Sequence, residues 1–194
     1  LASDGLTLSI TIITSAVLCT GLILLFIKLK GGISIAEYLG LKKMGWKTIL
    51  LMIAIFIAML GLSMLWGFAT SGGDEQDSGF MIDIFRGVWP PLLWLTVAGI
   101  GPFFEEAFFR GFLFVGLRQS RLGTVATIIV TSLLWAALHI QYSLFGMAEI
   151  LVMGLILGTV RHKTGSLWSS FLIHALWNGA ALAITALYIS SGGA

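Results

Sequence analysis

The segment from Gly101 to Gly111, which reads GPFFEEAFFRG, constrains the fold most, because it puts ionisable side chains inside an apolar stretch. Glu105, Glu106 and Arg110 fall within six residues, and the residues around them are mostly apolar. An ionised side chain at the centre of a membrane costs roughly 2.5–3.5 kcal/mol on insertion scales, so such residues usually mark a functional site. We therefore expect the rest of the chain to bury this segment and to supply it with partners.

The composition predicts a membrane protein with several spans. Hydrophobic residues make up 58% of the 194 residues and charged residues only 10%, whereas a soluble domain carries about 25% charged residues. The net charge of +2 is too small, and the basic residues are too dispersed, to indicate a nucleic-acid-binding protein. Cys19 is the single cysteine of the chain and lies in an apolar run. Because there is only one cysteine, an internal disulfide and a zinc site built from cysteines are excluded.

Six apolar runs are long enough to cross a membrane, since a span needs about 20 mainly apolar residues. We expect helices at residues 6–27, 49–68, 88–118, 123–140, 144–160 and 167–189. The predicted fold class is an all-α membrane protein, a bundle of about six transmembrane helices with an intramembrane polar site. Residues 1–87 would supply two helices, a polar connector and an acidic outer loop at residues 70–83. Residues 88–194 would form the core of the same bundle.

Prolines and glycines mark special backbone positions in these helices. The pair Pro90–Pro91 suits the first turn of the third helix, where a missing N–H costs little. Pro102 lies three residues before Glu105, so it should kink the helix or leave a carbonyl without its usual donor. The GxxxG pattern of residues 154–158 favours close helix packing inside the bundle over homodimerisation.

Lysine and arginine are unevenly distributed between the two sides of the predicted bundle, and short cytoplasmic loops are enriched in these residues. One side carries Lys28, Lys30, Lys42, Lys43, Lys47, Arg118, Arg121, Arg161 and Lys163. The other side carries Arg86 together with Asp74, Glu75, Asp77 and Asp83. We therefore expect the first side to be cytoplasmic, and both termini to lie outside the cytoplasm in a multi-pass protein of the cell membrane.

Few ionisable or amide side chains remain at membrane depth once the connections are removed. They are Glu105, Glu106, Arg110, His139, Glu149, His174 and Asn178. Glu106 and Arg110 are four residues apart and so share a helix face, which allows an internal ion pair with Arg110 as the structural partner. His174 and Asn178 have the same spacing, so both can point at one place.

The depth of these side chains can be estimated from a rise of 1.5 Å per residue, counted from the nearest basic residue on the cytoplasmic side. Glu105 would lie about 20 Å deep, His139 about 27 Å and Asn178 about 22 Å. Three helices would thus bring polar groups to one level in the outer half of the bilayer.

This set of side chains suits hydrolysis without a covalent intermediate. A buried glutamate and a histidine can take a proton from water, and a second histidine and an amide can donate hydrogen bonds to the developing oxyanion. Glu105, His139 and His174 could instead ligate a divalent metal, for which zinc best matches the ligand types. The sequence contains neither HExxH nor GxSxG, so it does not support the usual zinc-protease geometry or serine catalysis.

The other polar and aromatic residues have plainer interpretations. Glu149 is expected to be a solvated residue near the outer end of its helix, and His162 a residue of a cytoplasmic loop. Trp135 and Trp177 are expected to lie beside the polar site.

Three motifs together resemble those of the CPBP family of intramembrane proteases, also called the Abi or CAAX-protease type. EExxxR is present at residues 105–110 and HxxxN at residues 174–178. Between them, residues 135–139 (WAALH) match FxxxH with Trp in place of the usual Phe. The resemblance covers roughly residues 91–179, and it implies that residues 88–194 are a catalytic helical core.

The resemblance also implies a role for each motif residue. Glu105 and His139 would activate the hydrolytic water, Glu106 and Arg110 would hold the helix and the carboxylate geometry, and His174 and Asn178 would form the oxyanion site. Family members are described as metalloproteases or as metal-independent glutamate proteases. The lack of cysteine ligands and of a second carboxylate shell favours a reaction that requires no cofactor, with zinc as the alternative.

The sequence therefore predicts an intramembrane endopeptidase whose partners are the lipid bilayer and a membrane-anchored protein or peptide substrate. A site in the outer half of the bilayer favours the C-terminal tail of an exported protein over a cytoplasmic prenylated CAAX tail. Two alternatives remain open. One is a proton- or cation-coupled carrier that uses Glu105, Glu106 and His139 as a relay. The other is a non-catalytic immunity or scaffold protein.

Overall fold

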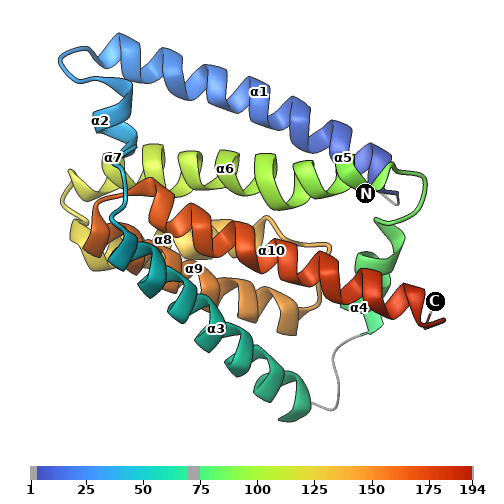
Figure 1. Ribbon diagram of the computed structural model, residues 1–194. Helices are drawn as coiled ribbons and strands as arrows, with labels where there is room; N and C mark the ends of the chain where they lie inside the picture. Colours follow the sequence, from blue (N-terminus) through green and yellow to red (C-terminus); the bar gives the residue numbers. More distant parts are fainter. Residues whose placement is uncertain (1–3, 70–74, 194) are drawn as a thin grey trace.

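The computed structural model describes residues 4–69 and 75–193, and all regular structure within these ranges is helical (Figure 1). In chain order the elements are α1 (Gly5–Lys30), α2 (Ile35–Leu39), α3 (Trp46–Ala69), α4 (Glu75–Asp83), α5 (Pro90–Trp94), η1 (Leu95–Ile100), α6 (Gly101–Glu106), η2 (Ala107–Leu113), α7 (Phe114–Arg118), α8 (Gly123–Ala137), α9 (Leu144–Thr164) and α10 (Leu167–Ser190). The elements α5 to α7, with the π-helical segments η1 and η2 between them, form one continuous helix that we call the central helix. The predicted all-α membrane fold is confirmed.

Five of the described helices are long and apolar enough to cross a membrane, namely α1, α3, the central helix, α9 and α10. They match five of the six predicted spans. The remaining predicted span, residues 123–140, corresponds to α8, which has 15 residues and ends at Ala137 rather than at residue 140. Fifteen residues extend about 22 Å, less than the hydrocarbon thickness of about 30 Å. His139 was expected inside this helix and lies instead in the turn that follows it.

Two predicted connections contain helical turns. The acidic loop expected at residues 70–83 holds α4, while residues 70–74, with Asp74, lie outside the described residues. The residues of α4 are not all polar, and Phe80 and Met81 pack against a buried cluster formed by Ile84, Leu93 and Leu182. Packing of apolar side chains thus stabilises a helix that composition alone did not predict.

The polar connector expected at residues 31–47 holds α2, whose Tyr38 and Leu39 are buried against Ile23 and Ile27 of α1. Burial raises the pKa of the Tyr38 phenol. The helix ends at Gly40, which has a left-handed backbone (φ 72°) that glycine adopts without strain. The connector is therefore partly ordered and packed, not simply a polar loop.

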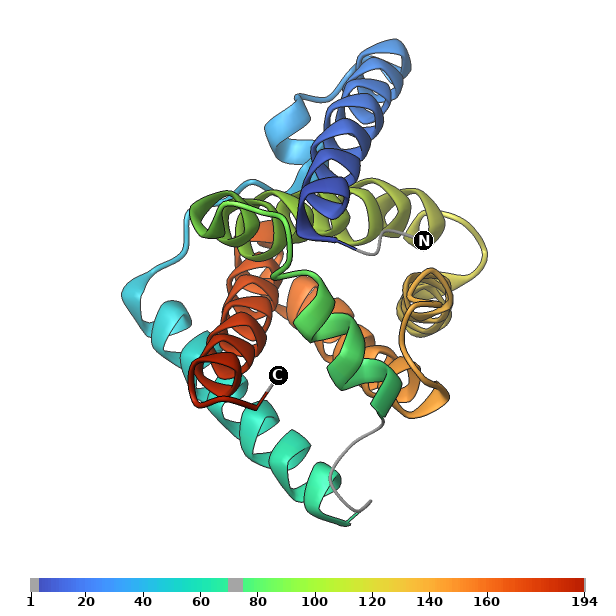
Figure 2. The same ribbon diagram turned by 90° about the vertical axis from the view of Figure 1, so that its right-hand side faces the viewer.

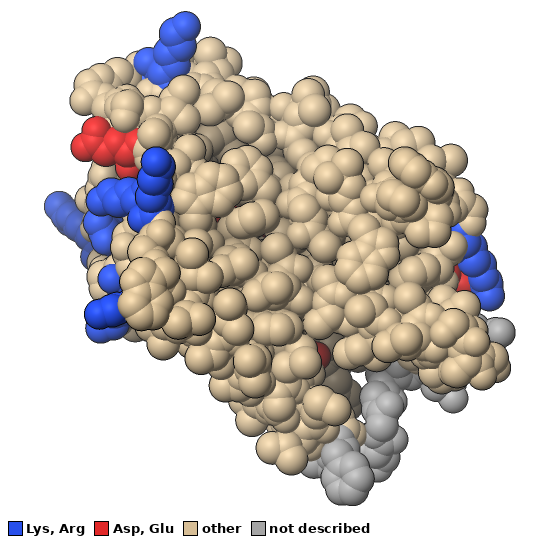
Figure 3. Space-filling view, viewed as in Figure 1, with Lys and Arg blue, Asp and Glu red and all other residues tan. Residues whose placement is uncertain are grey.

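The central helix runs between α1 on one side and α10 on the other (Figure 1). Helix α3 packs on α10, and α8 pairs with α9 as an antiparallel hairpin (Figure 2). Both termini lie at one end of the molecule, whereas α2 and α7 lie at the opposite end. Figure 3 shows lysine and arginine gathered at the α2 end, separated from the other end by a belt of uncharged side chains. This distribution matches the two sides predicted from the sequence.

Large apolar side chains remain exposed on the outward faces of the peripheral helices. Val17 of α1 and Met64 of α3 are 67% and 72% exposed. A soluble protein rarely leaves such extended apolar faces uncovered, so these faces fit contact with lipid chains.

The central helix is irregular just before the glutamates. Gly101 donates its N–H to the carbonyl of Thr96, five residues back, as in a π-helix. In the next such pair the donor would be residue 102, which is a proline without an N–H. The carbonyl of Val97 is therefore left to Asn178, whose Nδ2 donates to it at 2.9 Å. Pro102 thus leaves a carbonyl for a side chain to satisfy, as predicted, and Pro90–Pro91 occupy the first turn of α5.

The GxxxG glycines of α9 face α8. A Cβ atom added to Gly154 would lie 2.9 Å from the Cβ of Ser132, and one added to Gly158 would lie 3.1 Å from Cγ2 of Ile128. The motif therefore serves close packing inside the bundle, as predicted.

Gly154→Ala should lower the free energy of unfolding by about 1–3 kcal/mol, because the added methyl group would force α8 and α9 apart. Gly61→Ala is the matched control, since a Cβ at Gly61 of α3 meets nothing within 4 Å. It should be neutral or slightly stabilising. Denaturant unfolding of the purified proteins in mild detergent, followed by circular dichroism, measures both. Equal effects of the two substitutions would contradict the packing argument.

Candidate active site

Glu106 is a fully enclosed ionisable group of the site. Arg110 donates from Nη1 to Glu106 Oε1 at 2.8 Å, and both side chains are fully buried. His174 of α10 places Nδ1 3.1 Å from the same oxygen. The predicted ion pair is therefore present, although residues 107–113 form the π-helical segment η2. Removing both charges from solvent is tolerable only because each has an opposite charge and a hydrogen bond.

Arg110 is fixed by three contacts besides Glu106. Its Nη2 donates to the carbonyl of Gly154 on α9 at 3.3 Å. Its guanidinium carbon lies 4.4 Å from the ring centroid of Trp135, a distance that allows a cation–π interaction. Its own carbonyl accepts a hydrogen bond from Arg161 Nε at 3.0 Å. Arg110 thus joins the central helix to α8 and α9.

Glu105 has a different environment from its neighbour. Its side chain is 25% exposed, and Oε2 accepts a hydrogen bond from the indole Nε1 of Trp135 at 2.6 Å. Successive helix residues are turned by about 100°, so adjacent glutamates face different surroundings. Its second oxygen, Oε1, has no hydrogen bond among the described residues. This oxygen is available to bind a substrate or water.

His174 bridges the two glutamates. Its Nε2 lies 3.9 Å from Glu105 Oε2, while Nδ1 contacts Glu106. A carboxylate that is already paired with Arg110 acts only as an acceptor, so Nδ1 of His174 carries a proton. In the neutral ring Nε2 is then an acceptor, and in the charged ring it is a second donor directed toward Glu105.

His139 also contacts Trp135. Its Nδ1 is 2.8 Å from the carbonyl of Trp135, and its ring makes an edge contact with the Trp135 ring at 5.1 Å. A carbonyl only accepts hydrogen bonds, so Nδ1 carries the proton and Nε2 is the basic nitrogen of the neutral ring. His139 and Glu105 therefore both contact the Trp135 side chain or backbone, and their predicted joint role in activating water stays a prediction.

Asn178 is one turn beyond His174, but its described contact is structural. Its amide donates to Val97 of η1, one of its two N–H groups being used there. The structure thus brings Glu105, Glu106, Arg110, His139 and His174 together around Trp135. It connects Asn178 to the backbone of the central helix, and its predicted role at the oxyanion stays a prediction.

Arg161 is a contributor that the sequence pattern did not reveal. It was grouped with the basic residues of the cytoplasmic side, yet it is only 7% exposed in the last turn of α9. It donates to the carbonyls of Arg110 and of Leu39. The Arg110 carbonyl is open to it because Phe114 donates to the carbonyls of Phe109 and Gly111 instead. No sequence signal distinguishes Arg161 from its exposed neighbour Lys163.

The connection between α8 and α9 is held by α4. Asp77 of α4 accepts hydrogen bonds from the backbone N–H and the hydroxyl of Ser143, at 2.6 and 2.9 Å. The Tyr142 hydroxyl donates to the sulfur of Met81, and the Tyr142 ring stacks on His139. Burial raises the pKa of Tyr142, so its phenol remains protonated at neutral pH. Helix α4 therefore helps to hold the turn that carries His139.

Two other predicted positions need correction or refinement. His162 was expected in a loop, but it lies in the last turn of α9 because the helix continues to Thr164. Glu149 lies near the start of α9, as expected, but it is half-buried and lines a cavity. Trp135 lies at the centre of the site, whereas Trp177 lines the same cavity as Glu149 and packs against the buried cluster that contains Trp135.

The alternative zinc site would need Glu105, His139 and His174 around one ion. Within residues 4–69 and 75–193, no group of three or more His, Cys, Asp or Glu side chains is placed to hold a metal ion. Glu105 approaches His174, whereas His139 contacts Trp135 and Tyr142. In this arrangement the three side chains Glu105, His139 and His174 do not form a metal site, and the choice between the metal-free and the zinc-dependent reaction stays a prediction.

Comparison with known proteins places the site within a recognised family segment. Residues 87–180 match the family described as type II CAAX prenyl endopeptidase Rce1-like. An uncharacterized 24.3 kDa protein of Escherichia coli is 35% identical over 82 residues, which cover 41% of this chain and 38% of that protein. The chain thus matches well under half of this relative's length. No solved structure matches the chain.

Glu106→Gln and Arg110→Met should each lower the free energy of unfolding by about 3–5 kcal/mol, because each leaves a buried charge without its partner. The double variant should lose less than the sum of the two, since it leaves neither charge behind. Denaturant unfolding of the three purified variants measures this coupling. If the stability losses of the two single variants add up to the loss of the double variant, the proposed coupling between Glu106 and Arg110 is contradicted.

The control for this experiment is Asp83→Asn. Asp83 pairs with Arg86 at 2.9 Å, but the two side chains are 43% and 71% exposed. An exposed pair contributes about 0–1 kcal/mol, so this variant should change stability little.

Proposed function

We propose that the protein is an intramembrane endopeptidase of the CPBP (CAAX-protease) type, because residues 87–180 match the Rce1-like family of CAAX prenyl endopeptidases. It would hydrolyse a peptide bond in a membrane-anchored protein. The observation that carries the proposal is the partly exposed carboxylate of Glu105, which accepts a hydrogen bond from Trp135, whose ring also contacts the rings of His139 and His174. A carrier or scaffold would not require a base with one open oxygen on an indole that also contacts two imidazoles.

The proposed reaction uses a water molecule activated by Glu105 and His139. Oε1 of Glu105 takes a proton from the water, whose oxygen attacks the carbonyl carbon of the substrate. The basic Nε2 of His139 accepts a hydrogen bond from the second O–H of this water, which keeps its hydrogen, and so orients it. The electrons of the carbonyl double bond move onto its oxygen, and a tetrahedral intermediate forms.

Collapse of this intermediate completes the reaction. The C–N bond breaks, and the proton held by Glu105 passes to the leaving amine nitrogen. His174 in its charged form would donate from Nε2 to the developing oxyanion, with Glu106 balancing its charge. Asn178 could add a donor through its second amide N–H. Glu106 and Arg110 act by holding the helix and need not touch the substrate.

The preferred substrate is the C-terminal tail of an exported protein. The basic α2 end of the molecule supports a cytoplasmic assignment for that end, with both termini on the outer side of the cell membrane. Glu105 lies thirteen residues from Arg118 at the basic end, or about 20 Å. A site at that depth is more accessible to a tail on the outer side than to a cytoplasmic prenylated tail.

Glu105→Gln should reduce cleavage by about 10²–10⁴-fold, since glutamine keeps the acceptor for Trp135 but cannot take a proton. His139→Ala should reduce it similarly, and Glu37→Gln, on α2, is the matched control. Cells that carry each variant are assayed for processing of candidate exported proteins by immunoblot. The purified protein is assayed with and without a chelator. Processing that survives in Glu105→Gln would overturn the mechanism, and activity that zinc restores after chelation would contradict the metal-free route.

The orientation predicts which side of the membrane a thiol reagent reaches. With Cys19→Ser as background, a membrane-impermeant maleimide should label Arg86→Cys in intact cells, because that side chain is exposed next to the start of α1, at the proposed outer end. It should label Lys42→Cys, at the basic end, only after permeabilisation. The reverse pattern would remove the argument for an exported substrate.

A further inference from the structure

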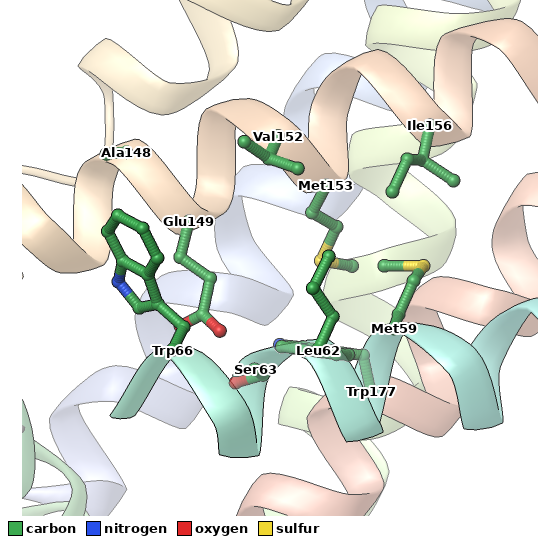
Figure 4. A pocket seen from close by; sticks show the side chains of 10 residues that line it. All are labelled: Met59, Leu62, Ser63, Trp66, Ala148, Glu149, Val152, Met153, Ile156 and Trp177. Carbon is green, nitrogen blue, oxygen red and sulfur yellow. The ribbon is translucent and has the colours of Figure 1, made fainter. Parts of the chain in front are cut away.

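A cavity of about 350 Å³ separates α3 from α9, and Trp177 of α10 forms part of its wall (Figure 4). Each of the two helices lines it with residues at positions i, i+3, i+4 and i+7, starting from Met59 on α3 and from Glu149 on α9. Such a pattern is the apolar stripe with which helices usually pack directly. Here the two stripes face a space large enough for a ligand, since ligand cavities begin at about 300 Å³.

Glu149 is the ionisable side chain among the described residues that line this cavity, whose other side chains are apolar apart from Ser63 and the indole N–H groups. Figure 4 shows its carboxylate directed from α9 toward α3, the helix that contributes Ser63 and Trp66 to the same lining. No hydrogen bond or ion pair to Glu149 is present among the described residues. A half-buried carboxylate in an apolar wall is stabilised by a cation that enters the cavity.

The cavity lies at the level of the reacting groups. Arg110 of the central helix and Gly154 of α9 are joined by a hydrogen bond, so they mark one level in the bundle. Both helices run in the same direction, and Glu105 and Glu149 each lie five residues before these positions, or about 7.5 Å. Trp177 follows His174 by three residues and so lies next to it on α10. The cavity therefore adjoins the site at the depth of Glu105.

We propose that the α3–α9 cavity binds a lysine or arginine side chain of an apolar substrate segment, with Glu149 as its ion-pair partner. This inference rests on the proposed function, and it adds that a basic residue close to the scissile bond is a recognition element. The wall suits a lysine or arginine side chain, because the methylene stem of that side chain can lie along Met and Leu groups while its charged end reaches Glu149. The indoles of Trp66 and Trp177 offer faces for a cation. An acyl chain would leave the carboxylate unpaired.

The test measures peptide binding separately from cleavage. The probe is a synthetic peptide with an 18-residue leucine–alanine segment, one lysine near its end and a dansyl group. The matched peptide has glutamine in place of lysine, and a third has glutamate. Energy transfer from protein tryptophans to dansyl reports the Kd for the full chain in phosphatidylcholine nanodiscs. Placing the lysine at successive positions finds the register that binds best.

The wild type should bind the lysine peptide about tenfold more tightly than the glutamine peptide. Glu149→Gln should lose this preference while still binding the glutamine peptide, which shows that the cavity has formed. Glu149→Lys should prefer the glutamate peptide, and Glu37→Gln should behave as the wild type does. A preference that persists in Glu149→Gln, or wild-type binding that does not distinguish the peptides, would overturn the proposal.

This experiment also separates the inference from the proposed function. Glu105→Gln should bind the lysine peptide as the wild type does, because Glu105 is not part of the cavity. If every protein binds as expected but the wild type cleaves no substrate, the protease assignment fails and the binding site stands. If Glu105→Gln loses cleavage but Glu149→Gln keeps the lysine preference, the protease assignment stands and this inference fails.

Discussion

The ion pair between Glu106 and Arg110 is the interaction on which the other contacts of the site depend. Two opposite charges, both fully buried, hold the central helix in a fixed relation to α8, α9 and α10. Arg110 lies over the ring of Trp135, and Trp135 in turn donates to Glu105. A buried pair of this kind is weak evidence for stability in itself, since its desolvation offsets much of the attraction. Its value here is positional, because it orients the groups that surround the exposed carboxylate.

The two adjacent glutamates illustrate how one helix can support two functions. Glu106 has an arginine and a histidine as partners, and no access to solvent. Glu105 is turned away from that pair, is partly exposed and has one hydrogen-bonded oxygen and one open oxygen. Because their environments differ, one carboxylate can remain a fixed charge while the other exchanges protons. The same residue type therefore serves structure at one position and, on our proposal, chemistry at the next.

Much of this arrangement could be predicted from local spacing. The i,i+4 relation of Glu106 and Arg110 and the similar depths of residues on three helices follow from helix geometry alone. The contacts that could not be predicted depend on how helices pack against one another. The indole of Trp135 reaches Glu105 across 30 positions, and Arg161 reaches Leu39 across 122. Helix α4 was not predicted for the same reason, since its apolar residues are stabilised by packing against Ile84 and Leu182, which its own sequence does not reveal.

The irregular backbone of the central helix is tolerated because neighbouring helices satisfy it. In a membrane, a free carbonyl must find a donor within the protein. The carbonyl of Val97 before Pro102 receives Asn178 of α10, and the carbonyl of Arg110 within η2 receives Arg161 of α9. Each irregular segment thus creates an acceptor, and each acceptor ties the central helix to a different neighbour. Along the central helix, the glutamates lie between these two hydrogen bonds. Their geometry is therefore set as much by the backbone on either side as by the side chains that they contact.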